Sequence, residues 1–241
     1  MKTWRCFFYM LLLVLNPALA GIQINATRVI YPAAKKEVTL SITNESTTPR
    51  LLQAWVDNGD PDVQPETAKL PFLVTPPISR IDPGKGQTLR IIFTGGTLPA
   101  DRESVFWLNI LEVQPKSSIS KENSDRIKFT VRSRLKVFYR PMGLPGSPND
   151  AAAQLHWRLI SQGKGYALEC DNPTAWNVSF HDVRLKSAPA VADTKQNGMC
   201  PAKGKKLIPV KEVMAPRSGR VLFTTIDDYG GYKEGESGYG P

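Results

Sequence analysis

Histidine is the first side chain to consider for catalysis or metal binding, and this chain has only two. His156 and His181 lie in segments with strand-like alternation, and neither stands at a ligand-like spacing from cysteine, aspartate or glutamate. Residues 163–165, Gly-Lys-Gly, lack the further glycine and the serine or threonine of a phosphate loop, and they are more typical of a hairpin. We therefore expect a protein that is not an enzyme, with no metal and no cofactor.

The first twenty residues have the composition of a secretory signal peptide. Lys2 and Arg5 precede an apolar block over residues 6–15, and residues 18–20, Ala-Leu-Ala, supply the small side chains that signal peptidase requires. The apolar block is too short for a stop-transfer helix, and no later segment is long and apolar enough to span a bilayer. We expect residues 1–20 to be removed and the product to be exported without membrane insertion.

Export bears on the cysteines that remain in the mature chain, Cys170 and Cys200. An oxidising compartment favours a disulfide between them. Redox activity is the alternative, but the CxxC spacing that usually accompanies it is absent. A structural disulfide is the preferred interpretation.

Loss of the leader lowers the net charge from +9 to +7, because Lys2 and Arg5 are removed with it. A basic protein could meet nucleic acid, an anionic surface or an acidic peptide. Export argues against nucleic acid, and no run of lysine or arginine is interleaved with aromatic residues. We expect no nucleic-acid partner.

Two cations are of interest because of the segments in which they lie. Arg28 would interrupt an otherwise apolar face if residues 22–30 formed one extended strand. The plain alternative is an edge position where the guanidinium reaches solvent. A second cation, Lys136, stands near the end of another long alternating segment, and this favours a binding role for the two together.

That second segment, RIKFTVRSRLKVFYRP, covers residues 126–141. Ile127, Phe129 and Val131 alternate with polar residues, as they would in an ordinary half-buried strand. Nine steps of about 3.3 Å give roughly 30 Å, which is longer than most strands, so the strand is expected to project beyond its own sheet. Lys136 has the opposite parity to the three apolar residues, and only a bulge or strong twist would bring it to their side.

Alternation with a period of two recurs along the chain and predicts an all-β fold. Segments with this pattern include residues 38–42, 89–93, 105–111, 155–160, 165–170, 176–185 and 219–226. Residues 141–150, PMGLPGSPND, read as a linker between a domain at 21–140 and a domain at 151–241. The glycine-rich tail from residue 230 is expected to be loose.

Six phrases, in order and at matching separations, resemble the periplasmic chaperones of the chaperone-usher pilus pathway, the PapD-like family. They are TRVIYP (27–32), TPPISRIDPGKGQTLRI (75–91), LPADRESVFWLNI (98–110), RLKVFYRP (134–141), DNPT (171–174) and IDDYGG (226–231). The resemblance extends over nearly the whole mature chain. It implies two immunoglobulin-like β-sandwich domains arranged as an L, with a cleft between them.

The resemblance also implies a site. In this family an arginine on the first strand and a lysine on the last strand of domain one bind the C-terminal carboxylate of an incomplete pilus subunit. Those positions are Arg28 and Lys136 here. Apolar residues of the last strand fill the groove left by the subunit's missing strand, and they fall on Ile127, Phe129 and Val131 within a donor strand near 126–138.

Three further charged residues match family positions that link the domains: Glu103, Arg140 and Asp228. A buried network of these groups would fix the domain angle, whereas the plain alternative is three exposed and unrelated charges. The short loop before the donor strand resembles the branch that assembles rod-like pili, and from the residues after Gly231 we expect no extra terminal strand of the kind that some members carry.

The function implied is that of a periplasmic chaperone that stabilises one pilus subunit at a time and delivers it to an outer-membrane usher without ATP. The alternative from another class is an exported β-sandwich adhesin or carbohydrate-binding module. Such a protein would show exposed aromatic platforms, and it gives no reason for Arg28 and Lys136 to converge.

Overall fold

The computed structural model describes residues 21–63, 70–113, 130–162, 165–186, 198–210 and 218–240. The predicted signal peptide and two of the predicted plugs, Ile127 and Phe129, lie outside these residues. Among the described residues, no helix has the length and apolar character needed to cross a membrane.

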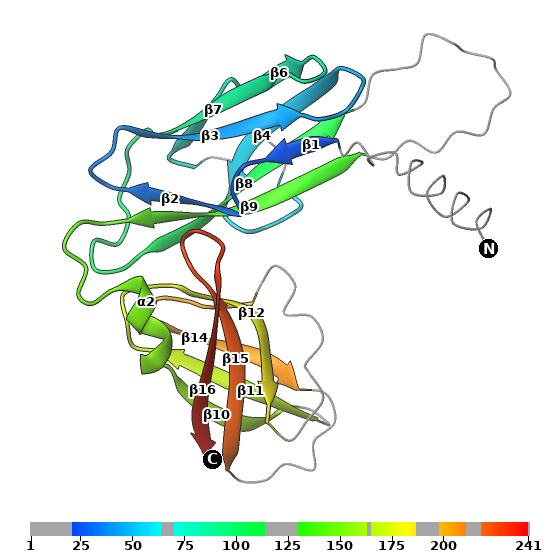
Figure 1. Ribbon diagram of the computed structural model, residues 1–241. Coiled ribbons are helices and arrows are strands. Elements are labelled where there is room, and N and C mark those ends of the chain that lie inside the picture. The colour runs from blue at the N-terminus through cyan, green and yellow to red at the C-terminus, as the bar shows by residue number, and fades with distance from the viewer. Residues whose placement is uncertain are drawn as a thin grey trace, which may run out of the picture.

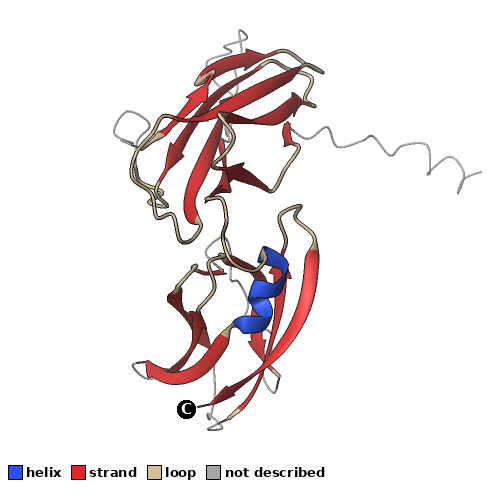
Figure 2. Cartoon of the chain, turned by 90° about the vertical axis from the view of Figure 1, so that its left-hand side faces the viewer, coloured by secondary structure: helices blue, strands red, loops and turns tan. Residues whose placement is uncertain are grey.

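The chain is all-β and forms two immunoglobulin-like domains, as the sequence predicts (Figure 1). Strands of the first domain run across the long axis of the molecule and those of the second run along it, which gives the bent shape. Among the described residues, the helical part is confined to α2 (Pro148–Ala151) and the 3-10 turn η2 (Ala152–Gln154), beside the second domain (Figure 2).

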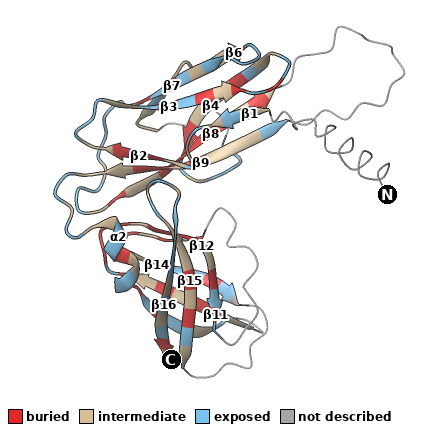
Figure 3. Ribbon diagram, in the orientation of Figure 1, coloured by how far each residue is buried: buried red, intermediate tan, exposed pale blue. Residues whose placement is uncertain are grey.

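Two sheets make up the first domain. One contains, in order, β1 (Ile22–Ile24), β3 (Glu37–Asn44), β7 (Gly86–Phe93) and β5 (Phe72–Thr75). The other contains β2 (Arg28–Pro32), β9 (Val131–Arg140), β8 (Ser104–Val113), β4 (Arg50–Asp57) and β6 (Ile78–Ile81). Their apolar faces meet in one core, with Leu89, Ile91 and Leu108 among its most buried members (Figure 3).

The first segment is two strands, and this corrects the expectation of one extended strand over residues 22–30. β1 pairs with β3 in one sheet, whereas β2 pairs with β9 in the other. The alternation therefore restarts when the chain changes sheets. Val29 and Tyr31 form the buried face of β2, and Arg28 lies on the opposite, half-buried face.

β8 and β9 form a regular antiparallel ladder from Val131 to Tyr139, with no shift of register. Leu135 and Val137 point into the core, so Lys136 between them points to the outer face of the sheet. No bulge is therefore needed in this part of β9 to explain the parity of Lys136. The core residues and the cations simply occupy opposite faces of the strand.

The second domain is a single curled sheet of seven strands. In spatial order they are β13 (Met199–Cys200), β12 (Val178–Leu185), β15 (Gly219–Ile226), β16 (Tyr232–Gly240), β10 (His156–Gln162), β11 (Gly165–Asn172) and β14 (Gly204–Val210). Residues from β10, β11, β12 and β15 share its core, Trp157 and Phe223 stacking there at 5.8 Å between ring centroids. Cys170 and Cys200 form the expected disulfide, which joins β11 to β13.

The C-terminal tail is a strand, and the expectation of a loose tail was wrong. β16 pairs with β15 from Tyr232 to Tyr239 and, at its end, in parallel with β10. The glycines that suggested looseness have a packing role, because a Cβ at position 235 would overlap the ring of Phe223. Tyr239 near the end of the strand is buried.

Candidate functional site

The parallel pairing of β2 with β9 brings Arg28 and Lys136 together. Their Cα atoms are direct partners in the ladder, although the two residues lie far apart in the sequence. Both side chains come from the half-buried outer face. The convergence that the family resemblance implied is therefore present in the fold.

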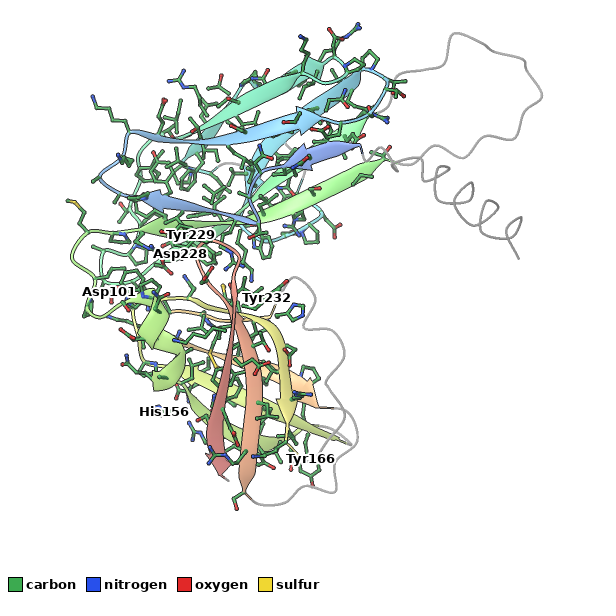
Figure 4. The ribbon with its side chains drawn as sticks, in the orientation of Figure 1. Asp101, His156, Tyr166, Asp228, Tyr229 and Tyr232 are labelled. Atoms are coloured by element: carbon green, nitrogen blue, oxygen red, sulfur yellow. A yellow bond between two sulfur atoms is a disulfide. The ribbon has the colours of Figure 1, made fainter. Side chains whose placement is uncertain are left out.

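Arg28 and Lys136 line a cavity of about 190 Å³ between the domains. From the first domain Trp107 and Arg134 also line it, and from the second domain come aromatic side chains, among them Phe180 and Tyr232. The cavity thus has cationic groups on one wall and aromatic groups around them. Figure 4 shows Tyr232 at the base of the loop that carries Asp228 and Tyr229 toward the first domain.

Among the residues that the structure describes, the ammonium group of Lys136 has only weak contacts. Its Nζ lies 3.3 Å from Oγ of Ser179 and 5.6 Å from the centroid of the Trp107 ring. Burial, together with the positive charge of Arg28, lowers the pKa of Lys136 from 10.5 to about 8. An anion placed beside this group would relieve both effects.

Arg28 is braced by the second domain. Its Nη1 donates a hydrogen bond of 2.9 Å to the carbonyl oxygen of Ile226, at the end of β15. Its Nε is buried and has no hydrogen-bond partner among the described residues. Burial lowers the pKa of Arg28, and the nearby carboxylates of Asp228 and Asp227 partly oppose that effect.

Within the described residues, neither cation has an acidic partner within ion-pair distance. A buried cation without a counter-ion is unfavourable, and a planar carboxylate could accept hydrogen bonds from both groups. The site is therefore suited to a small anionic group at the end of a chain. The described residues contain no cluster of side chains that could hold a metal ion.

One edge of β9 is open next to this cavity. β8 covers one side of the strand over its described length, whereas β2 covers the other side only from Lys136 to Arg140. The backbone from Val131 to Leu135 is therefore unpaired on that side among the described residues. Val131 has 52% of its surface exposed, whereas Leu135 and Val137 lie in the core.

The structure also brings together the three charged residues that were expected to link the domains. Arg140 donates to Glu103 at 2.8 Å and to both oxygens of Asp228 at 2.8 and 3.0 Å. Burial lowers the pKa of Arg140, but its bonds to Asp228 and Glu103 outweigh burial and raise it overall. Glu103 is 5% exposed and accepts a further bond from the backbone of Asn177.

Several residues of this interface were missed from the sequence. Asn177 and Ser179 reach it from the second domain, and Lys203 forms an ion pair of 2.7 Å with Asp101. Lys203 is also the one non-glycine residue with positive φ, at 49°, in the described chain. No local pattern marks these residues, because their partners come from the other domain.

Comparison with known proteins agrees with this architecture. Residues 21–145 match the family model described as pili and flagellar-assembly chaperone, PapD N-terminal domain. Residues 150–237 match the model described as pili assembly chaperone PapD, C-terminal domain.

Individual relatives are similar over most of their length. The chaperone protein FimB/FhaD of Bordetella pertussis is 42% identical over 218 residues, covering 89% of this chain and 86% of that protein. The probable fimbrial chaperone YadV of Escherichia coli is 39% identical over 233 residues, covering 92% and 91%. In the structure of the Salmonella enterica SafA pilin in complex with the SafB chaperone, a chain that is 27% identical superposes with a TM-score of 0.76, covering 94% and 99%. The chain therefore belongs to the PapD family of pili assembly chaperones.

Proposed function

We propose that this protein is a periplasmic chaperone that binds fimbrial subunits by donor-strand complementation and passes them to an outer-membrane usher without ATP. The observation that carries the proposal is the pairing of Arg28 with Lys136 at the point where the open edge of β9 reaches the interdomain cavity. An exported adhesin would give no reason for these two cations to meet.

The two halves of the site have different tasks. The open edge of β9 can add its strand to an incomplete subunit, each backbone hydrogen bond contributing about 0.5 to 1.5 kcal/mol. Apolar plugs contribute more, about 1.5 to 3 kcal/mol for each fully buried side chain. In this proposal Val131 is one plug, and Ile127 and Phe129 continue the series outside the described residues.

The cations fix the register of the added strand. A slip of one residue would turn every plug away from the subunit's groove. A terminal carboxylate bound by Arg28 and Lys136 prevents such a slip, because charge-assisted hydrogen bonds depend strongly on geometry. The bound carboxylate therefore fixes how the two strands align.

The proposed delivery of the subunit to an usher and the proposed compartment of the protein are inferred from the family. The structure of SafA with SafB shows that a chaperone of this fold binds a pilin. An outer-membrane usher as the acceptor, and the periplasm as the compartment, follow from the role of fimbrial chaperones in general. The disulfide between Cys170 and Cys200 suits an oxidising compartment.

The proposal is tested by co-expressing a fimbrial subunit in the periplasm with the wild-type protein, Lys136→Ala or Lys85→Ala. Lys85 is an exposed lysine of the first domain outside the cleft, so it serves as the control. We expect the subunit to accumulate with the wild type and with Lys85→Ala, and to be degraded with Lys136→Ala. Equal subunit levels with all three proteins would refute the clamp.

A further inference from the structure

A second group of charged residues lies on the outer face of the five-stranded sheet and was not expected from the sequence. At its centre is Asp57, at the end of β4, whose side chain has no exposed surface. The carboxylate accepts hydrogen bonds from Arg134 at 2.8 and 2.9 Å and from Asn109 at 2.7 Å. It also accepts one of 2.7 Å from the backbone of Gly59. The buried charge is thus fully bonded.

Two arginines of β9 are anchored to this group. Nε of Arg134 donates to Oδ1 of Asn109 at 3.1 Å, and Nε of Arg132 donates to the same oxygen at 2.9 Å. Arg132 also reaches Asp57 at 3.4 Å. Asp57 and Asn109 therefore tie β9 to β4 and β8 through side chains, in addition to the backbone ladder.

Aromatic rings pack against the same arginine side chains. The guanidinium of Arg134 lies 5.1 Å from the centroid of the Trp107 ring, and Lys136 lies 5.6 Å from the same centroid. Arg132 lies over Trp55 at 4.8 Å. A guanidinium fixed along its edge by two acceptors and along its face by a ring has little rotational freedom left.

Arg134 also belongs to the cleft, because it lines the same cavity as Arg28 and Lys136. It stands two residues before Lys136 on β9, on the same outer face, so the two side chains are neighbours along the strand. A chain end bound by Lys136 would have to pass Arg134. The cluster of two arginines and one carboxylate keeps a surplus positive charge at this wall.

We propose that Arg134 is a third cationic contact for the chain end of the bound subunit, and that Asp57 and Asn109 are the positioning residues that hold it toward the cavity. This inference rests on the proposed function. Lys136 has only a 3.3 Å contact with Ser179 and can adjust to the carboxylate, whereas Arg28 is held by one hydrogen bond and Arg134 by three. A rigid Arg134 beside an adjustable Lys136 selects the direction from which the chain end enters.

The test uses the C-terminal peptide, about fifteen residues long, of a fimbrial subunit that co-purifies with the wild-type protein. It is prepared both as the free acid and as the C-terminal amide. Binding of both forms is measured by calorimetry for the wild type, Arg134→Gln, Arg134→Lys, Asp57→Asn and Lys136→Ala. Arg80→Gln is the control, because Arg80 is an exposed arginine of the same domain paired with Asp82.

We expect Arg134→Gln to weaken binding of the acid about tenfold and to leave binding of the amide within about twofold, since one charge-assisted bond is lost. Arg134→Lys keeps the charge but lacks the planar guanidinium that bonds Asn109 through Nε and Asp57 through Nη2, so it should lose nearly as much. Asp57→Asn should show the same acid-specific loss, and Arg80→Gln none. A damaged fold would instead weaken acid and amide together.

The proposal is overturned if Arg134→Gln folds as the wild type does and either binds the acid with unchanged affinity or loses acid and amide equally. Wild-type affinity in Arg134→Lys would overturn the positioning role, and this variant serves also if Asp57→Asn does not fold. Lys136→Ala separates this inference from the proposed function. If Lys136→Ala also keeps full preference for the acid, the clamp itself is wrong; if it alone loses that preference, only the role of Arg134 is wrong.

Discussion

Lys136 carries its charge in surroundings that oppose ionisation. Burial and the nearby Arg28 lower its pKa to about 8, and its ammonium contacts a hydroxyl and an aromatic ring. In the unfolded chain the same group titrates near 10.5. Between these two values the unfolded state binds more protons, so the free energy of unfolding rises with pH in that window.

We predict that the stability of Lys136→Met relative to wild type depends on pH. At pH 7 the free energy of unfolding of the variant should be higher than that of the wild type, because a buried ammonium has been removed. This gain is at most about 3 kcal/mol. The gain should shrink as pH rises from 8 to 10.5, because the wild-type lysine then becomes neutral. Urea unfolding of both proteins at several pH values measures it, and a difference that stays constant over the window would contradict the assigned pKa.

The affinity for a subunit should change with pH in the opposite direction to the stability of the wild-type protein. A bound carboxylate stabilises the ammonium form of Lys136, so the complex takes up a proton when it forms above pH 8. We predict that affinity for a subunit peptide with a free C-terminal carboxylate falls as pH rises from 7.5 to 9.5. The C-terminal amide is the control. Equal pH dependence of acid and amide would count against a charged Lys136 in the complex.

At the scale of the element, β9 combines two kinds of strand. From Lys136 onward it has neighbours on both sides, whereas β8 is the only described strand that pairs with its first half. An exposed edge is a liability in most proteins, since it can pair with any other strand. Here the edge leads to the pair Arg28 and Lys136, which in the proposed function gives such pairing a defined register and end.

Val131 and Val137 offer a matched test of this division. Val131→Thr should leave stability within about 0.5 kcal/mol, because the side chain is 52% exposed, but should reduce recovery of the subunit complex several-fold. Val137→Thr should instead lower stability by about 1 to 3 kcal/mol, because Val137 is fully buried. Thermal unfolding and co-purification distinguish the two. Full recovery of the complex with Val131→Thr would remove Val131 from the donor strand.

β16 offers a second test at this scale. Gly235→Ala should lower the stability of the second domain by about 1 to 3 kcal/mol, because its Cβ overlaps the Phe223 ring. Gly240→Ala is the control, since nothing lies near a Cβ there. Differential scanning calorimetry measures both. Equal melting temperatures for the two variants would argue against the pairing of β16 with β15.

At the scale of the whole molecule, the described residues hold the two domains together through a largely buried charged network and through further hydrogen bonds and an exposed ion pair. Arg140 is the centre of the network, bonded to Glu103 of its own domain and to Asp228 of the other. It also lies 4.9 Å from the ring centroid of Trp176. Because the loop bearing Asp228 follows Ile226, the same contacts hold the carbonyl that braces Arg28.

We predict that Arg140→Ala lowers stability by about 3 to 5 kcal/mol, because it leaves Glu103 buried without its partner. It should also widen the range of domain angles seen by small-angle X-ray scattering. Asp101→Ala breaks the exposed ion pair with Lys203 and should change stability by less than about 1 kcal/mol. A fully stable Arg140→Ala with an unchanged scattering profile would contradict a structural role for the network.

The sequence by itself determined most of the strands, the family and the two cations of interest. Alternation with a period of two is a local property of any strand with one buried face. The strands β3, β7, β8 and β12 could therefore be predicted from the sequence. Ordered phrases then pointed to the family, and through it to Arg28 and Lys136, to Arg140 and its two carboxylates, and to the chaperone function.

Only the tertiary structure decided which face each residue occupies and which distant residues meet. Arg28 lies on a different face from the one that the sequence predicted, because the chain crosses between sheets after β1. The tail forms the strand β16 because β15 and β10 pair with it. Asp57 gave no local signal, since its partners come from β8 and β9. Strand pairing joins residues of large sequence separation, and local propensity contains no information about such partners.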